Sequence, residues 1–163
     1  MVERRPPAFR NLLGYQISST ADALRRSAAM CMRREHDVSL AQVRALALIE
    51  NLQPVRLRDV AADAGADKAQ ISRVVSSLVT RGLVSRRALQ GDARSAHLEL
   101  TDAGREKVNG LFATMQERDR TMRAALQAGE FDQFVGYLAR IRKAAEQLAL
   151  DEERLGGNAG ITH

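Results

Sequence analysis

Apolar side chains recur along this chain at the period of an α-helix over most of its length. A first stripe predicts a long helix over residues 8–34, because its members stand three or four positions apart. They are Leu13, Ile17, Ala21, Leu24, Ala28 and Cys31. Ser39, with Gln42 three positions later, has the capping-box pattern that starts a second helix. Toward the C-terminus, two more apolar stripes separated by Gly129 predict helices within residues 102–155.

Between these long helices lies a segment with the spacing of a helix-turn-helix. Ala61 stands where two crossing helices leave room only for a small side chain, and Gly65 supplies the positive φ of a tight turn. Ile71 packs back beneath the first of the two helices, and Asp67 is a good N-cap for the second. The alternative interpretation is an ordinary helical hairpin in an alanine-rich protein.

A β-hairpin is predicted directly after this motif. Apolar and polar residues alternate over 83–88 and again over 96–100, and the loop 89–95 between them has Gly91 at its turn. The predicted fold class is therefore mainly α with a small β-hairpin wing. In this fold a winged helix-turn-helix is flanked by N-terminal and C-terminal helices.

Charged side chains of the hairpin are candidates for contacting DNA. Arg86 and Arg87 lie on its first strand, and Arg94 is expected at its tip. Asp92 stands two residues before Arg94, so its carboxylate can hold the guanidinium in one rotamer for entry into a narrow minor groove. The alternative is that Asp92 only satisfies the amides of the turn.

The polar face of the second helix of the motif is the candidate for reading base edges. It carries cations, an amide and hydroxyls, but no carboxylate after Asp67. Gln pairs bidentately with adenine and Arg with guanine, whereas Ser and Lys hold phosphates. A solvated helix face is the alternative. The candidate DNA-binding residues are Lys68, Ala69, Gln70, Ser72, Arg73, Ser76, Arg86, Arg87, Asp92 and Arg94.

Composition agrees with a nucleic-acid partner and argues against catalysis. The chain has 163 residues and a net charge of +5, and nearly all its cations are Arg, although genomic base composition can produce the same bias. Its single cysteine excludes an intrachain disulfide, and its three histidines lack metal-ligand spacing. No catalytic or cofactor motif is present, so we expect no enzyme, cofactor or metal. Without a signal core or membrane-spanning apolar run, we expect a cytoplasmic protein.

The wing segment also resembles that of a known family. Asp92-x-Arg94 followed by HLELT looks like the wing signature of MarR-type regulators (multiple-antibiotic-resistance regulators), and residues 57–87 and 12–17 are similar to that family too. The resemblance covers residues 9–150. It implies an obligate homodimer whose recognition helices enter successive major grooves of a pseudo-palindromic DNA operator. It also implies repression that a small phenolic or aromatic effector relieves.

The resemblance implies one domain built from three kinds of segment. We expect dimerisation helices over 8–34 and 102–155, a DNA-binding lobe over 39–101 and a flexible tail over 156–163. The apolar surface of the long helices independently favours a dimer, because a lobe of this size cannot cover it. A winged helix can also serve as an effector-independent DNA-architectural or protein-interaction module, and this remains the alternative function.

Four further side chains have two interpretations each. Arg10 and Tyr15 are candidates for an acidic aromatic effector, with phosphate steering or dimer packing as the alternative. His36, expected in the loop after the first helix, faces either an effector or solvent. His97 is expected to pack on its strand or lie at the surface. Cys31 lies on the buried stripe, so we expect packing rather than oxidant sensing.

Overall fold

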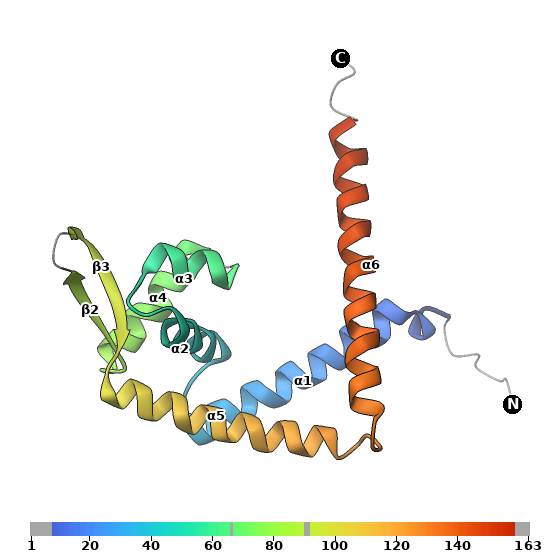
Figure 1. The fold of residues 1–163 in the computed structure, drawn as a ribbon, viewed down its shortest axis with the longest axis horizontal. Coiled ribbons are helices and arrows are strands. Elements are labelled where there is room, and N and C mark those ends of the chain that lie inside the picture. The colour runs from blue at the N-terminus through green and yellow to red at the C-terminus, as the bar shows by residue number, and fades with distance from the viewer. Residues whose placement is uncertain (1–7, 66, 90–91, 159–163) are drawn as a thin grey trace, which may run out of the picture. The chain divides into compact units, whose positions relative to one another are not determined.

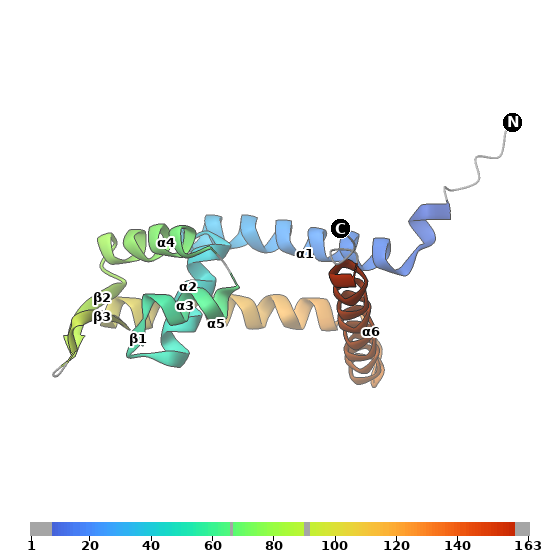
Figure 2. The same ribbon diagram turned by 90° about the horizontal axis from the view of Figure 1, so that it is seen from above.

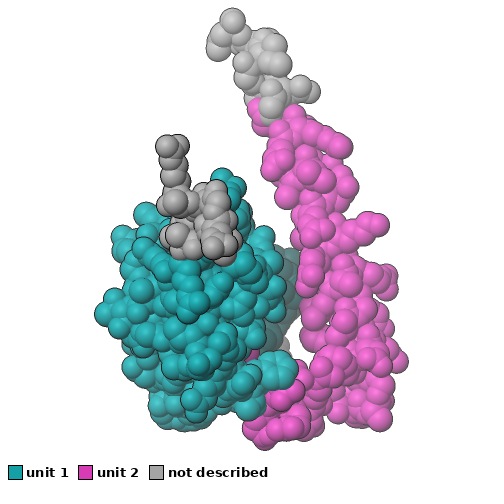
Figure 3. Space-filling view, turned by 60° about the vertical axis from the view of Figure 1, so that its left-hand side comes forward, with its two compact units in different colours: residues 1–114 teal, residues 115–163 magenta. Residues whose placement is uncertain are grey.

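The computed structural model describes residues 8–65, 67–89 and 92–158, without the side chains of residues 8, 88, 89, 92–96, 157 and 158. The chain divides into two compact units, residues 1–114 and 115–163, which Figure 3 distinguishes by colour. The boundary falls inside a helix, and the first long helix belongs to the first unit together with the helix-turn-helix.

Helices make up most of the first unit, and a β-hairpin lies at one end of it (Figures 1 and 2). In chain order its elements are η1 (Ala8–Asn11), α1 (Leu13–His36), α2 (Leu40–Leu52), β1 (Val55–Arg56), α3 (Leu57–Ala64), α4 (Lys68–Thr80), β2 (Val84–Leu89), β3 (Asp92–Leu100) and the first part of α5 (Asp102–Arg123). The predicted fold class, mainly α with a small wing, is confirmed.

The first helix differs from its prediction at both ends. Residues 8–11 form a separate 3-10 turn, because Leu12 has an extended backbone with ψ of 135° and interrupts the helical path. At the other end α1 continues to His36 and stops at Asp37, whose φ of 53° places it in the left-handed region. Asp is one of the few non-glycine residues that adopt this conformation readily. The helix therefore covers Leu13–His36 rather than 8–34.

The start of α2 forms as predicted. The Ser39 hydroxyl accepts a hydrogen bond from the Gln42 amide at 3.2 Å, and the Ser39 amide donates to the Gln42 side-chain oxygen at 2.9 Å. This reciprocal capping box satisfies two backbone donors at the helix N-terminus. It also places Val38, which is fully buried, directly before the helix.

The core of the first unit is aliphatic and joins α1, α2, α4 and the sheet. Its most deeply buried large side chains are Met32, Leu46, Ile49, Leu78 and Leu98, none more than 1% exposed. Burying a side chain of this size stabilises the fold by about 1.5–3 kcal/mol. Only the C-terminal end of α1 takes part in this core, through Cys31 and Met32.

The sheet has three antiparallel strands in the order β1-β3-β2. Val84 pairs with Leu100 at the base of the hairpin, and Leu89 pairs with Asp92 at its outer end. The second strand of the hairpin therefore begins at Asp92 rather than at residue 96, and the predicted turn residue Gly91 lies outside the described residues. The sequence did not predict β1, which pairs Val55 with Leu98, because two residues are too few to show alternation.

The second unit consists of the end of α5 and of α6 (Glu130–Asn158). Gly129, with φ of +83°, separates the two helices as predicted. The Arg123 guanidinium lies 3.6 Å above the centre of the Phe131 ring. Since α6 continues to Asn158, the predicted tail at 156 starts too early. No helix in the described part of the chain is long and apolar enough to cross a bilayer.

Candidate nucleic-acid interface

The turn between α3 and α4 has the three features that its spacing predicted. Gly65 has φ of +56°, and its amide donates to the Ala62 carbonyl at 3.0 Å. Ala61 is 7% exposed and Ile71 is 4% exposed, so both lie in the helix contact. A short turn with a small residue at the crossing allows α4 to stand across α3 and present its other face to solvent.

Asp67 caps the N-terminus of α4. Its carboxylate oxygen Oδ2 accepts hydrogen bonds from the amides of Ala69 at 3.1 Å and Gln70 at 3.2 Å. This confirms the predicted N-cap and fixes the first turn of the helix. The side chains of α4 that were predicted to contact DNA are exposed, except for Ser72, which is half-buried. The exposed members of the predicted set on this helix are Lys68, Ala69, Gln70, Arg73 and Ser76.

The wing and α4 are joined by a side-chain hydrogen bond. Arg86, exposed on β2, donates from Nη2 to the hydroxyl of Ser76 on α4 at 3.2 Å. Both residues were predicted as direct DNA contacts, and sequence reasoning missed that they bind each other. Arg87, the next residue on β2, is exposed and pairs across the sheet with His97.

The wing residues Asp92 and Arg94 both belong to the second strand of the hairpin. Asp92 is the first residue of β3, and Arg94 is its third, so Arg94 stands within the strand. The prediction that Arg94 is at the tip is wrong because β3 is four residues longer than its alternation suggested. Their side chains lie outside the described part of the chain, and the proposed contact between them stays a prediction.

His97 is part of the packing of the wing base. It is 7% exposed on β3, and its Nε2 lies 3.4 Å from Nε of Arg56 on β1. Of the two sequence interpretations, strand packing is confirmed. Among the described residues, no group of three or more His, Cys, Asp or Glu side chains is arranged to hold a metal ion.

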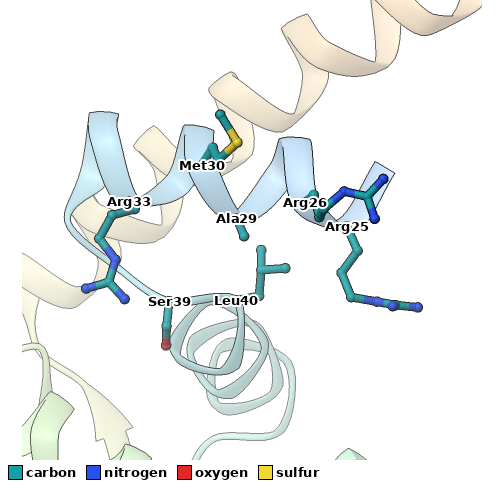
Figure 4. A pocket seen from close by; sticks show the side chains of 7 residues that line it. All are labelled: Arg25, Arg26, Ala29, Met30, Arg33, Ser39 and Leu40. Carbon is teal, nitrogen blue, oxygen red and sulfur yellow. The ribbon is translucent and has the colours of Figure 1, made fainter. Parts of the chain in front are cut away.

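A groove of about 500 Å³ lies between α1 and the start of α2 (Figure 4). Ala29 and Leu40 face each other across it, with Arg25 and Arg33 on either side. The groove is lined by Arg25, Arg26, Ala29, Met30, Arg33, Ser39 and Leu40. Arg25 also binds Asp22 through a 2.6 Å ion pair. An apolar floor with guanidinium groups at its rim suits an organic anion.

The predicted effector residues do not come together within one chain. Tyr15 lies near the start of α1, edge-on to Phe9 with ring centres 5.4 Å apart, and Arg10 precedes the helix. His36 ends α1, 21 residues after Tyr15, which corresponds to about 31 Å along the helix axis.

His36 is also not in a solvated loop, as the sequence interpretation had it. It is half-buried, and its Nε2 lies 2.8 Å from the Thr114 hydroxyl of α5. Sequence reasoning missed the groove arginines, although their spacing of eight residues along one helix face was a usable signal.

Cys31 is buried at 7% exposure, as predicted from its place on the apolar stripe. The adjacent carboxylate of Glu35 has a pKa below its usual value, because it accepts hydrogen bonds from Arg34, Cys31 and Thr114 and lies beside the Arg34 charge. Thr114 Oγ1 stands 3.4 Å from Glu35 Oε2. These contacts fasten the end of α1 to α5 within the first unit.

Comparison with known proteins shows a family likeness in the part of the chain that contains the helix-turn-helix. The MarR family model matches residues 38–96, which include α2, α3, α4 and β2. Over these residues the chain is similar to the MarR family. The chain is 29% identical over 108 residues to YdgJ of Bacillus subtilis, named as an uncharacterized HTH-type transcriptional regulator. The alignment covers 64% of the chain and 64% of YdgJ, which is just under two thirds of each.

Two solved structures share the fold. The S. aureus MepR–DNA complex has a TM-score of 0.70 and 18% identity, covering 82% of this chain and 98% of MepR. The PcaV transcriptional regulator from Streptomyces coelicolor, solved with its natural ligand, has a TM-score of 0.65 and 24% identity. That match covers 82% of this chain and 96% of PcaV.

Proposed function

We propose that this chain is a MarR-type, sequence-specific regulator of transcription that binds double-stranded DNA as a homodimer and acts as a repressor. The main support for DNA binding is the arrangement of side chains on the N-terminal half of α4. Its cap is satisfied by Asp67, and Lys68, Gln70 and Arg73 stand exposed beyond it. Recognition helices of helix-turn-helix proteins contact base edges through such N-terminal residues.

The division of labour follows from side-chain chemistry. Gln70 has the paired donor and acceptor that match adenine, and Arg73 has the fork that matches guanine. Lys68 supplies a point charge for a phosphate, and Arg87 of the wing lies on the strand that leads outward from α4. Asp92 and Arg94 complete the proposed wing contact with the minor groove. The structure of MepR with DNA supports this use of the fold.

A second copy of the chain is the proposed partner of the exposed apolar helices. In the first unit, α1 leaves Leu13 and Leu24 at 59% and 47% exposure although they belong to its apolar stripe. In the second unit, α6 has no buried side chain among those described, and Phe134 and Leu148 are exposed. A two-fold dimer covers the same surface on both copies and presents two α4 helices to half-sites one helical turn apart.

The groove between α1 and α2 is the proposed effector site. Its apolar floor at Ala29 and Leu40 and its rim at Arg33 fit an aromatic carboxylate. The ligand-bound structure of PcaV supports an effector for this fold. Arg10 and Tyr15 can join such a site only through the second copy, because they lie at the far end of α1.

DNA binding is tested by selection from a random duplex library with the full chain, followed by titration of the enriched duplex and a scrambled duplex of equal composition. We expect enrichment of a two-fold symmetric sequence, and a dimer mass by sedimentation. The Arg73→Ala variant should lose affinity for the enriched duplex, whereas Arg142→Ala, on exposed α6, is the matched control. A monomer, or a library without enrichment, would favour the architectural or protein-interaction alternative.

The effector is tested separately by thermal unfolding with benzoate, 4-hydroxybenzoate and phenol, the last as an uncharged analogue. Ligand binding to the native state raises the melting temperature in proportion to occupancy. We expect the carboxylates, and not phenol, to raise it, and Arg33→Gln to remove the effect. Stabilisation that survives Arg33→Gln would place the site elsewhere, and no stabilisation by any of the three would leave an effector-independent regulator.

A further inference from the structure

The C-terminal half of α4 is tied to three different elements by side-chain bonds. Ser76 binds Arg86 of the wing. Ser77, the next residue, accepts a hydrogen bond from Nε2 of Gln42 at 3.1 Å. Arg81, directly after the helix, binds Asp37 at the end of α1. The N-terminal half, which carries the proposed base contacts, is thus held from the other end of the helix.

The contact between Arg81 and Asp37 uses both arms of the guanidinium. Nη1 donates to the backbone carbonyl of Asp37 at 2.8 Å, and Nη2 donates to its carboxylate oxygen Oδ2 at 3.3 Å. Asp37 itself has left-handed φ and is the C-cap residue of α1. A planar fork bound at two points fixes both the distance and the orientation of the groups that it joins. The end of α4 is therefore set relative to the end of α1.

The Gln42 contact lies one helical turn earlier. Ser77 and Arg81 are four positions apart and so share one face of α4. Both bind the segment that we define as the α1–α2 corner, residues 37–42. Two anchors about 6 Å apart along a helix define its direction as well as its position.

We propose that Asp37 and Arg81 are positioning residues that set the direction of α4 from the α1–α2 corner and thereby the sequence selectivity of DNA binding. The inference rests on the proposed DNA-binding function. The distance from Arg81 to Lys68 is about 20 Å along the helix, so a tilt of about 5° moves the N-terminus by nearly 2 Å. Such a shift breaks bidentate contacts to bases, whereas flexible Lys and Arg side chains still reach phosphates.

The α1–α2 corner also lies next to the proposed effector groove, so it links that groove to the two contacts that hold α4. Ser39 and Leu40 belong to the corner and line the groove. A ligand that displaces the corner acts on both anchors of α4 without touching the recognition face. We expect such a ligand to weaken binding to the selected duplex and to change binding to random DNA little.

Stability alone is a poor explanation of the contact. The Asp37 side chain is 83% exposed and that of Arg81 is 30% exposed, and ion pairs of this kind contribute little to folding. Substitution of Asp37 by Gly removes the carboxylate but favours left-handed φ. Asp37→Gly should therefore keep or raise the melting temperature while it lowers selectivity. A residue with only a structural role would change both in the same direction.

The experiment measures the ratio of the dissociation constants for the scrambled duplex and the duplex that the wild-type chain enriches. We expect Asp37→Gly and Asp37→Asn each to lower this ratio about fivefold, a size typical of coupling between sites. Affinity for the scrambled duplex should stay equal or rise, because a negative charge is removed. Arg81→Lys should lower the ratio too, and combining it with Asp37→Asn should add little. Asp63→Asn, at an exposed position of α3, is the control.

Two results would overturn the proposal. One is an unchanged ratio in Asp37→Gly and Asp37→Asn. The other is an equal loss on both duplexes in Arg81→Gln with a salt slope reduced by about one, which identifies Arg81 as a direct phosphate contact. If the wild-type chain enriches no duplex at all, the proposed function fails instead, and this outcome is distinct because it precedes any variant.

Discussion

A Cβ atom on residue 104 would lie 2.0 Å from the carbonyl oxygen of Leu83. Gly104 stands in the first turn of α5, and Leu83 directly precedes the first strand of the wing. The same carbonyl accepts a hydrogen bond from the Thr101 amide at 3.1 Å. The absence of a side chain on Gly104 thus lets α5 approach the base of the wing at backbone distance.

Substitution Gly104→Ala should destabilise the chain by about 2–4 kcal/mol, because backbone rather than a flexible side chain must move to admit the methyl group. Denaturant unfolding measures the loss. Gly110→Ala is the matched control in the same helix, where the new Cβ would meet the His36 ring at 3.5 Å, an ordinary contact distance. That change should be neutral or stabilising by about 0.5–1 kcal/mol. Equal effects at the two positions would contradict the close approach.

The cap of α4 gives a second prediction. Asp67→Ala removes the acceptor of two amide hydrogen bonds and should lower the free energy of unfolding by about 1 kcal/mol, whereas Asp67→Ser should be nearly neutral. Urea titration of both variants checks this order. Asp63→Ala, an exposed residue near the end of α3, should change stability by less than about 0.5 kcal/mol. A similar loss from Ala and Ser would show that the loss does not come from the cap, because Ser can replace its hydrogen bonds.

Reading of bases and binding of phosphates are separable on α4. Gln70→Ala should reduce discrimination between the enriched and scrambled duplexes by about 1–3 kcal/mol. Lys68→Ala should weaken both by the same factor and lower the salt slope by about one. Titrations at several salt concentrations distinguish the two results. A uniform loss in Gln70→Ala would remove it from the proposed set of base contacts.

Acid sensitivity follows from the contacts of Glu35. Hydrogen bonds from Arg34 and then Cys31 lower its pKa in the folded chain below the usual 4.5. A carboxylate whose pKa is lowered by folding gives stability that is fully present above its unfolded-state pKa and is lost as the pH falls through the folded-state pKa. Glu35→Gln should therefore show a smaller drop in melting temperature between pH 6 and pH 3 than the wild type, and Glu152→Gln on α6 serves as control. An identical drop in Glu35→Gln would exclude this contribution.

The sequence predicted those parts of the fold that depend on local chemistry. The capping box at Ser39, the N-cap at Asp67 and the positive φ of Gly65 each arise within four residues, so spacing alone revealed them. The exposed face of α4 followed from the period of its buried side chains. The family resemblance is confirmed by the match over residues 38–96.

Contacts between distant segments were not predictable in the same way. The Arg81–Asp37 contact spans 44 positions, and the His36–Thr114 contact spans 78. Nothing in the local pattern around Asp37 states which cation it meets, although Asp next to a helix end is a signal for left-handed φ. The strand β1 was not predicted, because it is a strand through its pairing with β3 rather than through its own composition.

The small size of β1 has a consequence for the wing as a mechanical part. It pairs with β3 only at residues 97 and 98, so β3 has a neighbouring strand on both sides only at the base of the hairpin. From residue 96 outward, only the neighbouring strand β2 supports β3 within the sheet. We expect this outer portion to bend more readily than the base of the hairpin, so that the wing can follow duplexes of varying curvature if the proposed DNA-binding function holds.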